Sequence, residues 1–278
     1  MSTAVFLAII ASAMLHATWN AMVKTGGAKL TGMVLVAVSN GLMGLVVAAF
    51  FPLPAAAVWP WILASGVIRT VYYLALGYAY EHGDLSRVYP IARGGAPLLV
   101  LVAGAFFLTD QIGTLQVSGI LLLGGGILLM ARGVFTHGES RRLVPFAIAS
   151  AMATAAYSIT DGTGARLSGE AISFVAWALA FTALLYLPIA LTLKGRTVLR
   201  AKPGEWVRGL LAGAASYLGY TIVVWSMTRA PIALVSALRE TSILFAVLIG
   251  WLVFSERMDR SKAFAALLIV AGAALTRF

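Results

Sequence analysis

Long apolar stretches alternate with short polar or Pro/Gly-containing connections along the whole chain. The stretches are about 20 residues long, which is the length that a helix needs to cross the hydrocarbon core of a bilayer. We predict ten such helices, at residues 4–23, 31–51, 58–80, 86–108, 113–131, 143–163, 172–193, 206–228, 231–254 and 261–276. The stretches lack the alternation typical of barrel strands, and an open sheet cannot satisfy its backbone in lipid. The pattern therefore predicts an all-α membrane protein with ten transmembrane helices.

The composition supports a chain that lies almost wholly in the membrane. Of 278 residues, 61% are hydrophobic and only 11% are charged, whereas soluble domains carry roughly 25% charged residues. There is no cysteine, which excludes disulfides and thiolate chemistry, and the three histidines are too scattered to indicate a metal site. We expect no metal and no cofactor.

The net charge of +10 comes from Lys and Arg in the connections, where lipid headgroups and membrane topology are sufficient reasons for it. The connections after odd-numbered predicted helices hold fourteen Lys and Arg, and those after even-numbered ones hold only Arg166 and Arg229. The positive-inside rule then predicts that the odd connections are cytoplasmic and both termini lie outside. We expect a multi-pass protein of the cell (inner) membrane with lipid and a small solute, not nucleic acid, as partners. The sequence leaves the oligomeric state open, and a monomer is compatible with it.

An internal repeat divides the chain into two halves. At an offset of 146 residues, Arg93 matches Arg239 and Gly126 matches Gly272. At a nearby offset of 138, the segment 11–14 (Ala-Ser-Ala-Met) recurs at 149–152. We therefore predict repeats at residues 1–138 and 139–278, with five helices in each. Because five is odd, the second repeat enters the membrane from the opposite side, which gives an inverted repeat of the kind found in alternating-access transporters.

The fourth helix of each predicted repeat makes the layout more specific. The first copy carries Pro97 and ends in Thr109-Asp110, and the second ends in Ser255-Glu256 before the helix that contains Gly272. This layout resembles the EamA-type transporters of the drug/metabolite transporter superfamily over nearly the whole chain. The family usually ends this helix with Gly-Glu and keeps a proline where the second copy has Ile243. The resemblance implies a secondary transporter with cytoplasmic termini, whereas the charges of this sequence favour external termini, and we follow the charges.

Polar side chains inside the fourth and ninth predicted helices are the strongest candidates for a site: Tyr89 and Arg93 on one, and Ser236, Arg239 and Glu240 on the other. An arginine inside hydrocarbon costs at least a few kcal/mol, so it should face protein or water. Together with Arg69 there are three such cations and one clearly intramembrane carboxylate, Glu240. One interpretation is a buried ion pair that locks the halves together. We favour an anion site, because at least one arginine then lacks a partner and a guanidinium suits bidentate recognition of a carboxylate or phosphate.

Three other predicted helices carry polar and aromatic faces: His16, Trp19 and Asn20 on the first, Arg69, Tyr72 and Tyr73 on the third, and Tyr217 and Tyr220 on the eighth. These side chains either line a solute cavity or serve helix packing and the aromatic belt. For Arg69 we expect a structural role, with its guanidinium reaching toward the interface. We expect Asp161, near the end of the predicted sixth helix, to cap a solvated terminus.

The leading functional hypothesis is a secondary-active, alternating-access transporter of a small anionic or zwitterionic metabolite, such as an amino-acid-like compound, a carboxylate or a phosphonate. Glu240 is the candidate proton carrier. An alternative is an exporter of amphipathic or aromatic compounds, in which the rings dominate recognition. A channel is disfavoured by an inverted repeat with a charged midplane. An integral-membrane enzyme is disfavoured because the sequence offers no constellation of nucleophile, base or metal ligands.

Overall fold

The computed structural model of the chain describes the backbone of residues 1–24, 29–82, 85–136, 143–254 and 260–278, and the side chains of residues 1–23, 30–79, 93–130, 144–253 and 260–278. Within these ranges the chain forms helices and no β-strand. The all-helical prediction is therefore correct for the described residues. The predicted turn at Ser255-Glu256 lies outside them.

Each half of the chain supplies a series of long helices. The first half forms α1 (Thr3–Lys24), α2 (Lys29–Ala48), α3 (Trp59–His82) after a 3₁₀ turn at Ala56–Val58, α4 (Leu85–Phe107) and α5 (Thr114–Thr136). The second half forms α6 (Leu143–Ser168), α7 (Ala171–Lys194), α8 (Pro203–Met227) after a 3₁₀ turn at Gly195–Leu199, α9 (Ile232–Arg239), α10 (Ser242–Phe254) and α11 (Arg260–Leu275).

The predicted ninth helix is broken into α9 and α10 at Glu240 and Thr241. Here hydrogen bonds between residues three apart replace the α-helical pattern: the Thr241 amide donates to the Leu238 carbonyl at 3.0 Å and the Ile243 amide to the Glu240 carbonyl at 3.0 Å. The Thr241 hydroxyl also donates to the Leu238 carbonyl at 2.7 Å. Four polar residues, Arg239 to Ser242, stand at this point, but no glycine or proline marks the end of a helix there. A 3₁₀ segment in the middle of a helix often marks a functional hinge.

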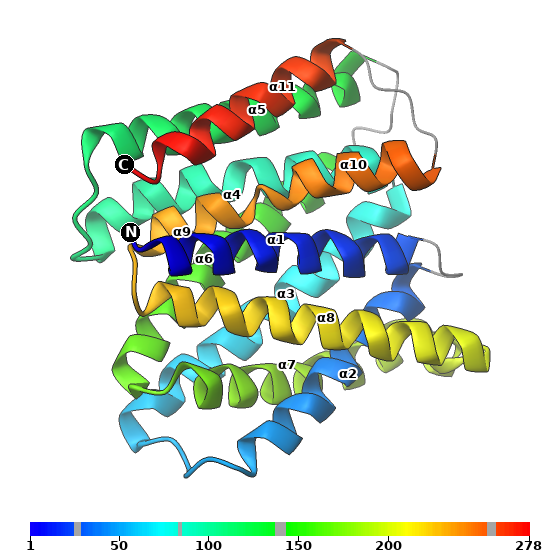
Figure 1. Ribbon diagram of the computed structural model, residues 1–278. Helices are drawn as coiled ribbons and strands as arrows, with labels where there is room; N and C mark the ends of the chain where they lie inside the picture. The colour runs from blue at the N-terminus through cyan, green and yellow to red at the C-terminus, as the bar shows by residue number, and fades with distance from the viewer. Residues whose placement is uncertain (25–28, 83–84, 137–142, 255–259) are drawn as a thin grey trace.

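The helices of the two halves interleave. Helix α1 packs on α8, α3 on α6, α2 on α7, and α5 on α11. Both termini lie at the same end of the bundle as the α4–α5, α6–α7 and α8–α9 connections, which we call the terminal end, whereas the α7–α8 connection lies at the far end (Figure 1). Helix α1 therefore begins at the terminal end and α6 ends there.

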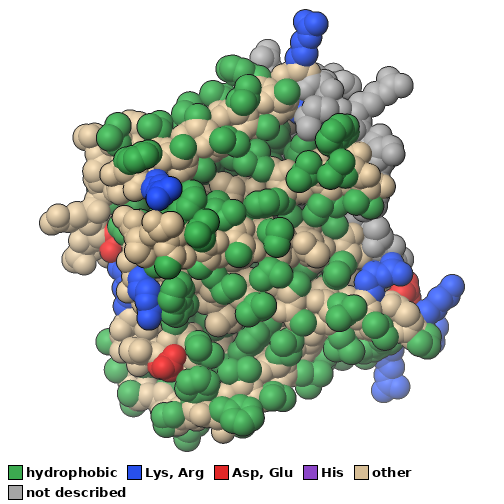
Figure 2. All heavy atoms as spheres, viewed as in Figure 1, with side chains coloured by type: hydrophobic (Ala, Val, Ile, Leu, Met, Phe, Trp, Pro, Cys, Tyr) green, Lys and Arg blue, Asp and Glu red, His purple; other side chains and the backbone are tan. Residues whose placement is uncertain are grey.

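The outer surface has the character of a lipid-facing surface. Large apolar side chains are exposed along several helices, among them Leu45, Phe106, Leu184 and Leu267. Figure 2 shows hydrophobic side chains spread across the face that it draws, with Lys and Arg mostly near its edges. Six helical segments are long and apolar enough to cross a membrane by length and composition: Thr3–Val23, Leu30–Ala48, Ala56–Ala79, Ala171–Leu199, Pro203–Met227 and Ile232–Val253. The chain thus has the features of a multi-pass membrane protein, and ten spans remain a prediction.

Candidate functional site

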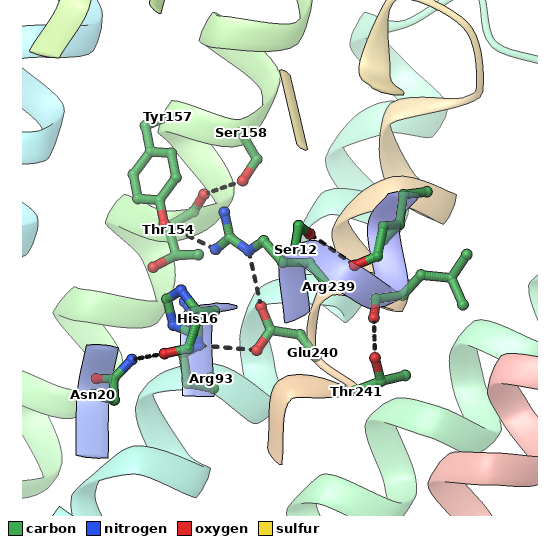
Figure 3. Close-up of polar contacts among 12 residues, drawn as sticks. Ser12, His16, Asn20, Arg93, Thr154, Tyr157, Ser158, Arg239, Glu240 and Thr241 are labelled. Carbon is green, nitrogen blue, oxygen red and sulfur yellow. Dashed lines mark hydrogen bonds and ion pairs between the residues drawn. The ribbon is translucent and has the colours of Figure 1, made fainter. Parts of the chain in front are cut away.

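The Glu240 carboxylate lies between two buried arginines from different halves. Its Oε2 is 2.9 Å from the Arg93 Nε, and its Oε1 is 3.6 Å from the Arg239 Nε. All three side chains are at most 3% exposed. Figure 3 shows the carboxylate between the two guanidinium groups. Arg93 and Arg239 thus both have a carboxylate partner, as in the buried ion pair that the sequence left open.

Each arginine also contacts the first helix of its own predicted repeat. The Arg93 Nη2 lies 2.7 Å from the His16 Nε2 on α1, and the Arg239 Nη2 donates to the Tyr157 hydroxyl on α6 at 2.9 Å. Helices α1 and α6 are the first helices of the two predicted repeats. The two arginines therefore have corresponding surroundings as well as corresponding positions in the sequence.

The helical pattern of backbone hydrogen bonds is altered close to both arginines. In α4, Pro97 has no amide hydrogen to donate to the carbonyl of Arg93, four residues before it. In the second repeat the helix itself ends at Arg239 and resumes at Ser242. Discontinuous helices are typical of solute and ion sites in membrane transporters.

A second buried ion pair lies beside the first. The Arg69 Nη2 donates to the Asp161 Oδ2 at 2.5 Å, and the Tyr220 hydroxyl donates to the same oxygen at 2.6 Å. The Arg69 side chain is 6% exposed and the Asp161 side chain is fully buried. Two expectations were therefore wrong: Asp161 is not a solvated helix terminus, because α6 continues to Ser168, and Arg69 does not reach the interface, because it bonds Asp161 in the interior.

Two tyrosine rings connect the ion pairs. The Arg69 guanidinium lies 4.4 Å from the ring centre of Tyr157 and 3.9 Å from that of Tyr220. The Arg239 guanidinium lies 5.7 Å and 5.9 Å from the same two rings. Cations at these distances from aromatic faces are attracted by the ring electrons. The described part of this cluster holds three arginines and two carboxylates, so its arginines exceed its carboxylates by one positive charge.

A cavity opens beside this cluster. It is lined by side chains of seven helices: Ser12, His16, Trp19, Asn40, Arg69, Tyr72, Tyr73, Tyr157, Leu179, Ala215, Ser216, Gly219, Tyr220, Val223 and Arg239. Its free volume of about 40 Å³ has room for roughly three water molecules. A metabolite would need the lining side chains to move apart.

Most of the predicted site residues meet at or beside this cavity. His16, Trp19, Tyr72, Tyr73, Tyr220 and Arg239 line it, and Asn20 donates to the His16 carbonyl at 2.8 Å. Two predicted residues lie elsewhere: Tyr217 packs in a separate cluster with Val58 and Phe174, and Ser236 is fully buried in α9. The side chain of Tyr89 lies outside the described residues.

The sequence prediction missed three contributors to the site: Asn40, Tyr157 and Asp161. The Asn40 amide donates to the Tyr73 and Ser216 hydroxyls, each at 3.4 Å. Tyr157 and Asp161 lie four residues apart on α6, on the same face as the buried Thr154 and Ser158. That spacing of polar residues along one helix face was the available signal, and it indicated an interior rather than a terminal position.

These features define the class: a helical, multi-pass membrane protein with a buried charged cluster beside an aromatic-lined cavity. The EamA-like transporter family matches residues 3–132 and 142–278, and the chain belongs to this family. A search of curated proteins finds no match. Among solved structures 29 chains match, and one, titled "Crystal structure of protein", has a TM-score of 0.76 at 18% identity, covering 99% of this chain and 96% of that chain. At this identity the likeness concerns the fold alone.

Proposed function

We propose that the chain is a secondary-active transporter that binds the anionic group of a small anionic or zwitterionic solute at Arg93 and Arg239. The observation that carries this proposal is the convergence of two repeat-equivalent arginines on the single carboxylate of Glu240 beside the cavity. A solute carboxylate or phosphonate competes with Glu240 for these guanidinium groups. The excess of positive charge in the described cluster favours an anion over a cation.

Inverted five-helix repeats would supply the alternating access that this function requires. The opposite directions of α1 and α6 across the bundle support such a relation (Figure 1). Contacts between α5 and α11 support it too. A Cβ on Gly126 would lie 3.0 Å from the Ala265 carbonyl oxygen, and one on Gly272 would lie 2.6 Å from that of Gly119. The offset of 146 residues maps the first of these contacts onto the second, as expected for two halves related by a two-fold axis.

Binding measurements on the purified protein test the anion site. A thermal-shift screen of amino acids, carboxylates, phosphonates and organic cations should show stabilisation by an anionic or zwitterionic compound. Arg93→Gln and Arg239→Gln should each weaken its binding by about 1.5–3 kcal/mol, or roughly ten- to hundredfold, the contribution of a charged hydrogen bond. Arg→Lys at the same positions should recover only part of the affinity, because an ammonium offers a point charge where a planar fork fits.

Arg208→Gln is the matched control, since it also neutralises an arginine but lies near the far end of α8, away from the cavity. The Arg208→Gln protein should bind the stabilising compound with the same affinity as the unsubstituted protein. If Arg93→Gln and Arg239→Gln both bind this compound as tightly as the unsubstituted protein does, the anion site is ruled out.

Glu240 is the proposed carrier of a coupling proton. If it carries the proton, Glu240→Gln spares solute exchange in proteoliposomes but abolishes accumulation driven by a pH gradient, because exchange requires no net movement of protons. Intact pH-driven uptake by this variant would remove Glu240 from the coupling mechanism.

The aromatic lining favours one second candidate, an exporter of amphipathic or aromatic compounds. Five rings face the cavity: Trp19, Tyr72, Tyr73, Tyr157 and Tyr220. In that case an uncharged aromatic compound stabilises the protein in the same screen, and its affinity is unchanged in Arg93→Gln.

A further inference from the structure

A group of charged hydrogen bonds connects several helices at the terminal end of the bundle. Arg166, near the end of α6, holds Asp110 with two contacts, Nη1 to Oδ1 at 2.7 Å and Nη2 to Oδ2 at 3.2 Å. Asp110 lies in the connection between α4 and α5. Two parallel hydrogen bonds between a guanidinium and a carboxylate are among the stronger polar contacts in proteins, and they also fix geometry.

The same two side chains also hold the segment that joins α8 to α9. The Arg166 Nε donates to the Met227 carbonyl at 2.8 Å, and its Nη2 donates to the Ala230 carbonyl at 3.0 Å. The Asp110 Oδ2 accepts the Ile232 amide, the first of α9, at 2.8 Å. One ion pair thus connects α4, α6, α8 and α9 at one end of the molecule.

Helix α9 extends from this ion pair to the charged cluster. It begins at Ile232, bound to Asp110, and ends seven residues later at Arg239, next to Glu240. Every residue of α9 is buried. The helix is not continuous with α10, because the 3₁₀ segment at Glu240 and Thr241 separates them. A short helix fixed at one end and hinged at the other can move as a unit.

We propose that Asp110 and Arg166 form the gate that closes the terminal end, and that α9 transmits the movement of this gate to Arg239. The proposal rests on the alternating-access function proposed above. In the closed state Asp110 is a positioning residue, which holds the start of α9 so that Arg239 stays against Glu240. Opening the ion pair releases α9, and Arg239 moves with it.

Labelling of single cysteines tests the gate without any solute, because the natural chain contains no cysteine. The reporter is Val223→Cys, in the cavity lining on the part of α8 nearest the terminal end. Membrane vesicles of both orientations are treated with an impermeant thiol reagent, and Arg229→Cys, at an exposed position of the terminal end, identifies the vesicles whose terminal end faces the reagent. Asp110→Asn should raise the labelling rate of Val223→Cys from that end by about tenfold, the equilibrium shift that loss of a charged hydrogen bond produces.

Arg166→Gln should raise the rate similarly, and the effect of the double variant should be smaller than the product of the two single effects, because both changes break the same ion pair. The control is Glu170→Gln, which removes a carboxylate at the same end whose hydrogen bond in the described structure is to the Ile172 amide. A fully buried reporter on the distant part of α6, Ala147→Cys, should stay unlabelled, which separates gate opening from general unfolding.

A reporter on α9 tests the second half of the proposal. Ser236→Cys is fully buried in the closed state and should become reactive in Asp110→Asn. Unchanged labelling of Val223→Cys in Asp110→Asn would overturn the gate, and an unreactive Ser236→Cys beside a faster Val223→Cys would overturn the role of α9. Failure of every anion in the solute screen would leave these labelling results standing, so the two proposals can fail separately.

Discussion

The substitution Glu240→Gln removes the carboxylate that lies between two buried guanidinium groups. At distances of 2.9 and 3.6 Å, each attraction is worth about 5 kcal/mol at the effective dielectric constant of about 20 that suits protein sites. Desolvation offsets much of this gain, but the two arginines stay buried when the carboxylate is lost. Removing one partner of a buried ion pair typically costs about 3–5 kcal/mol. We expect Glu240→Gln to lower the free energy of unfolding by about this amount.

The fluorescence of the seven tryptophans provides a melting curve for the detergent-purified protein. A loss of 3–5 kcal/mol corresponds to a fall of roughly 6–20 °C in the melting temperature for a chain of this size. Adding Arg239→Gln to Glu240→Gln removes one of the unbalanced cations, so the double variant should be no less stable than the single one. Glu170→Gln, an exposed carboxylate, is the control and should melt like the parent. A Glu240→Gln protein that melts with the control, or a double variant that is clearly less stable than the single one, would refute this account of the cluster.

Three further predictions concern other parts of the molecule. Asp161→Asn should destabilise the protein by about 3–5 kcal/mol because it leaves Arg69 buried without its carboxylate, and combining it with Arg69→Met should restore part of the melting temperature. Gly272→Ala should cost about 1–3 kcal/mol, since its Cβ would lie 2.6 Å from backbone atoms of α5, whereas Gly125→Ala, with nothing within 4 Å, should melt like the parent. A cysteine at Arg200 should react with an impermeant reagent in inside-out vesicles and not in intact cells, because the positive-inside rule places this connection in the cytoplasm.

The sequence was most informative where charge interrupts an apolar pattern. Arg93 and Arg239 stand out because an arginine inside a membrane helix requires a compensating partner. Their matching positions in the two repeats made them candidates for one site, and the structure brings both to Glu240. The sequence did not identify Asp161 as a buried charge. The sixth helix was predicted to end at residue 163, which placed Asp161 at a terminus, but the helix continues to Ser168. A shift of five residues turned an apparent terminus into an interior position.

Other features depend on contacts that one sequence does not encode locally. Tyr217 and Tyr220 are three residues apart on α8 and share a face, but Tyr220 bonds Asp161 while Tyr217 packs beside Phe174. Which ring reaches the site is set by the neighbouring helices, since residues at this spacing differ by about 60° around the helix axis. No glycine or proline marks the break between α9 and α10 in the sequence. At the break the Thr241 hydroxyl donates to the Leu238 carbonyl, and the Glu240 side chain is fully buried.

The pairing of Arg69 with Asp161 also bears on how the chain enters the membrane during synthesis. An aspartate or arginine at the centre of a lone helix raises its insertion free energy by about 2.5–3.5 kcal/mol. Helix α6, with Asp161 and its buried Ser and Thr residues, is not among the segments that are apolar enough to span by themselves in the described chain. We therefore expect α6 to leave the translocon efficiently only when α3 is already present to supply Arg69, so that a contact at the centre of the folded bundle also sets the order in which its helices are inserted.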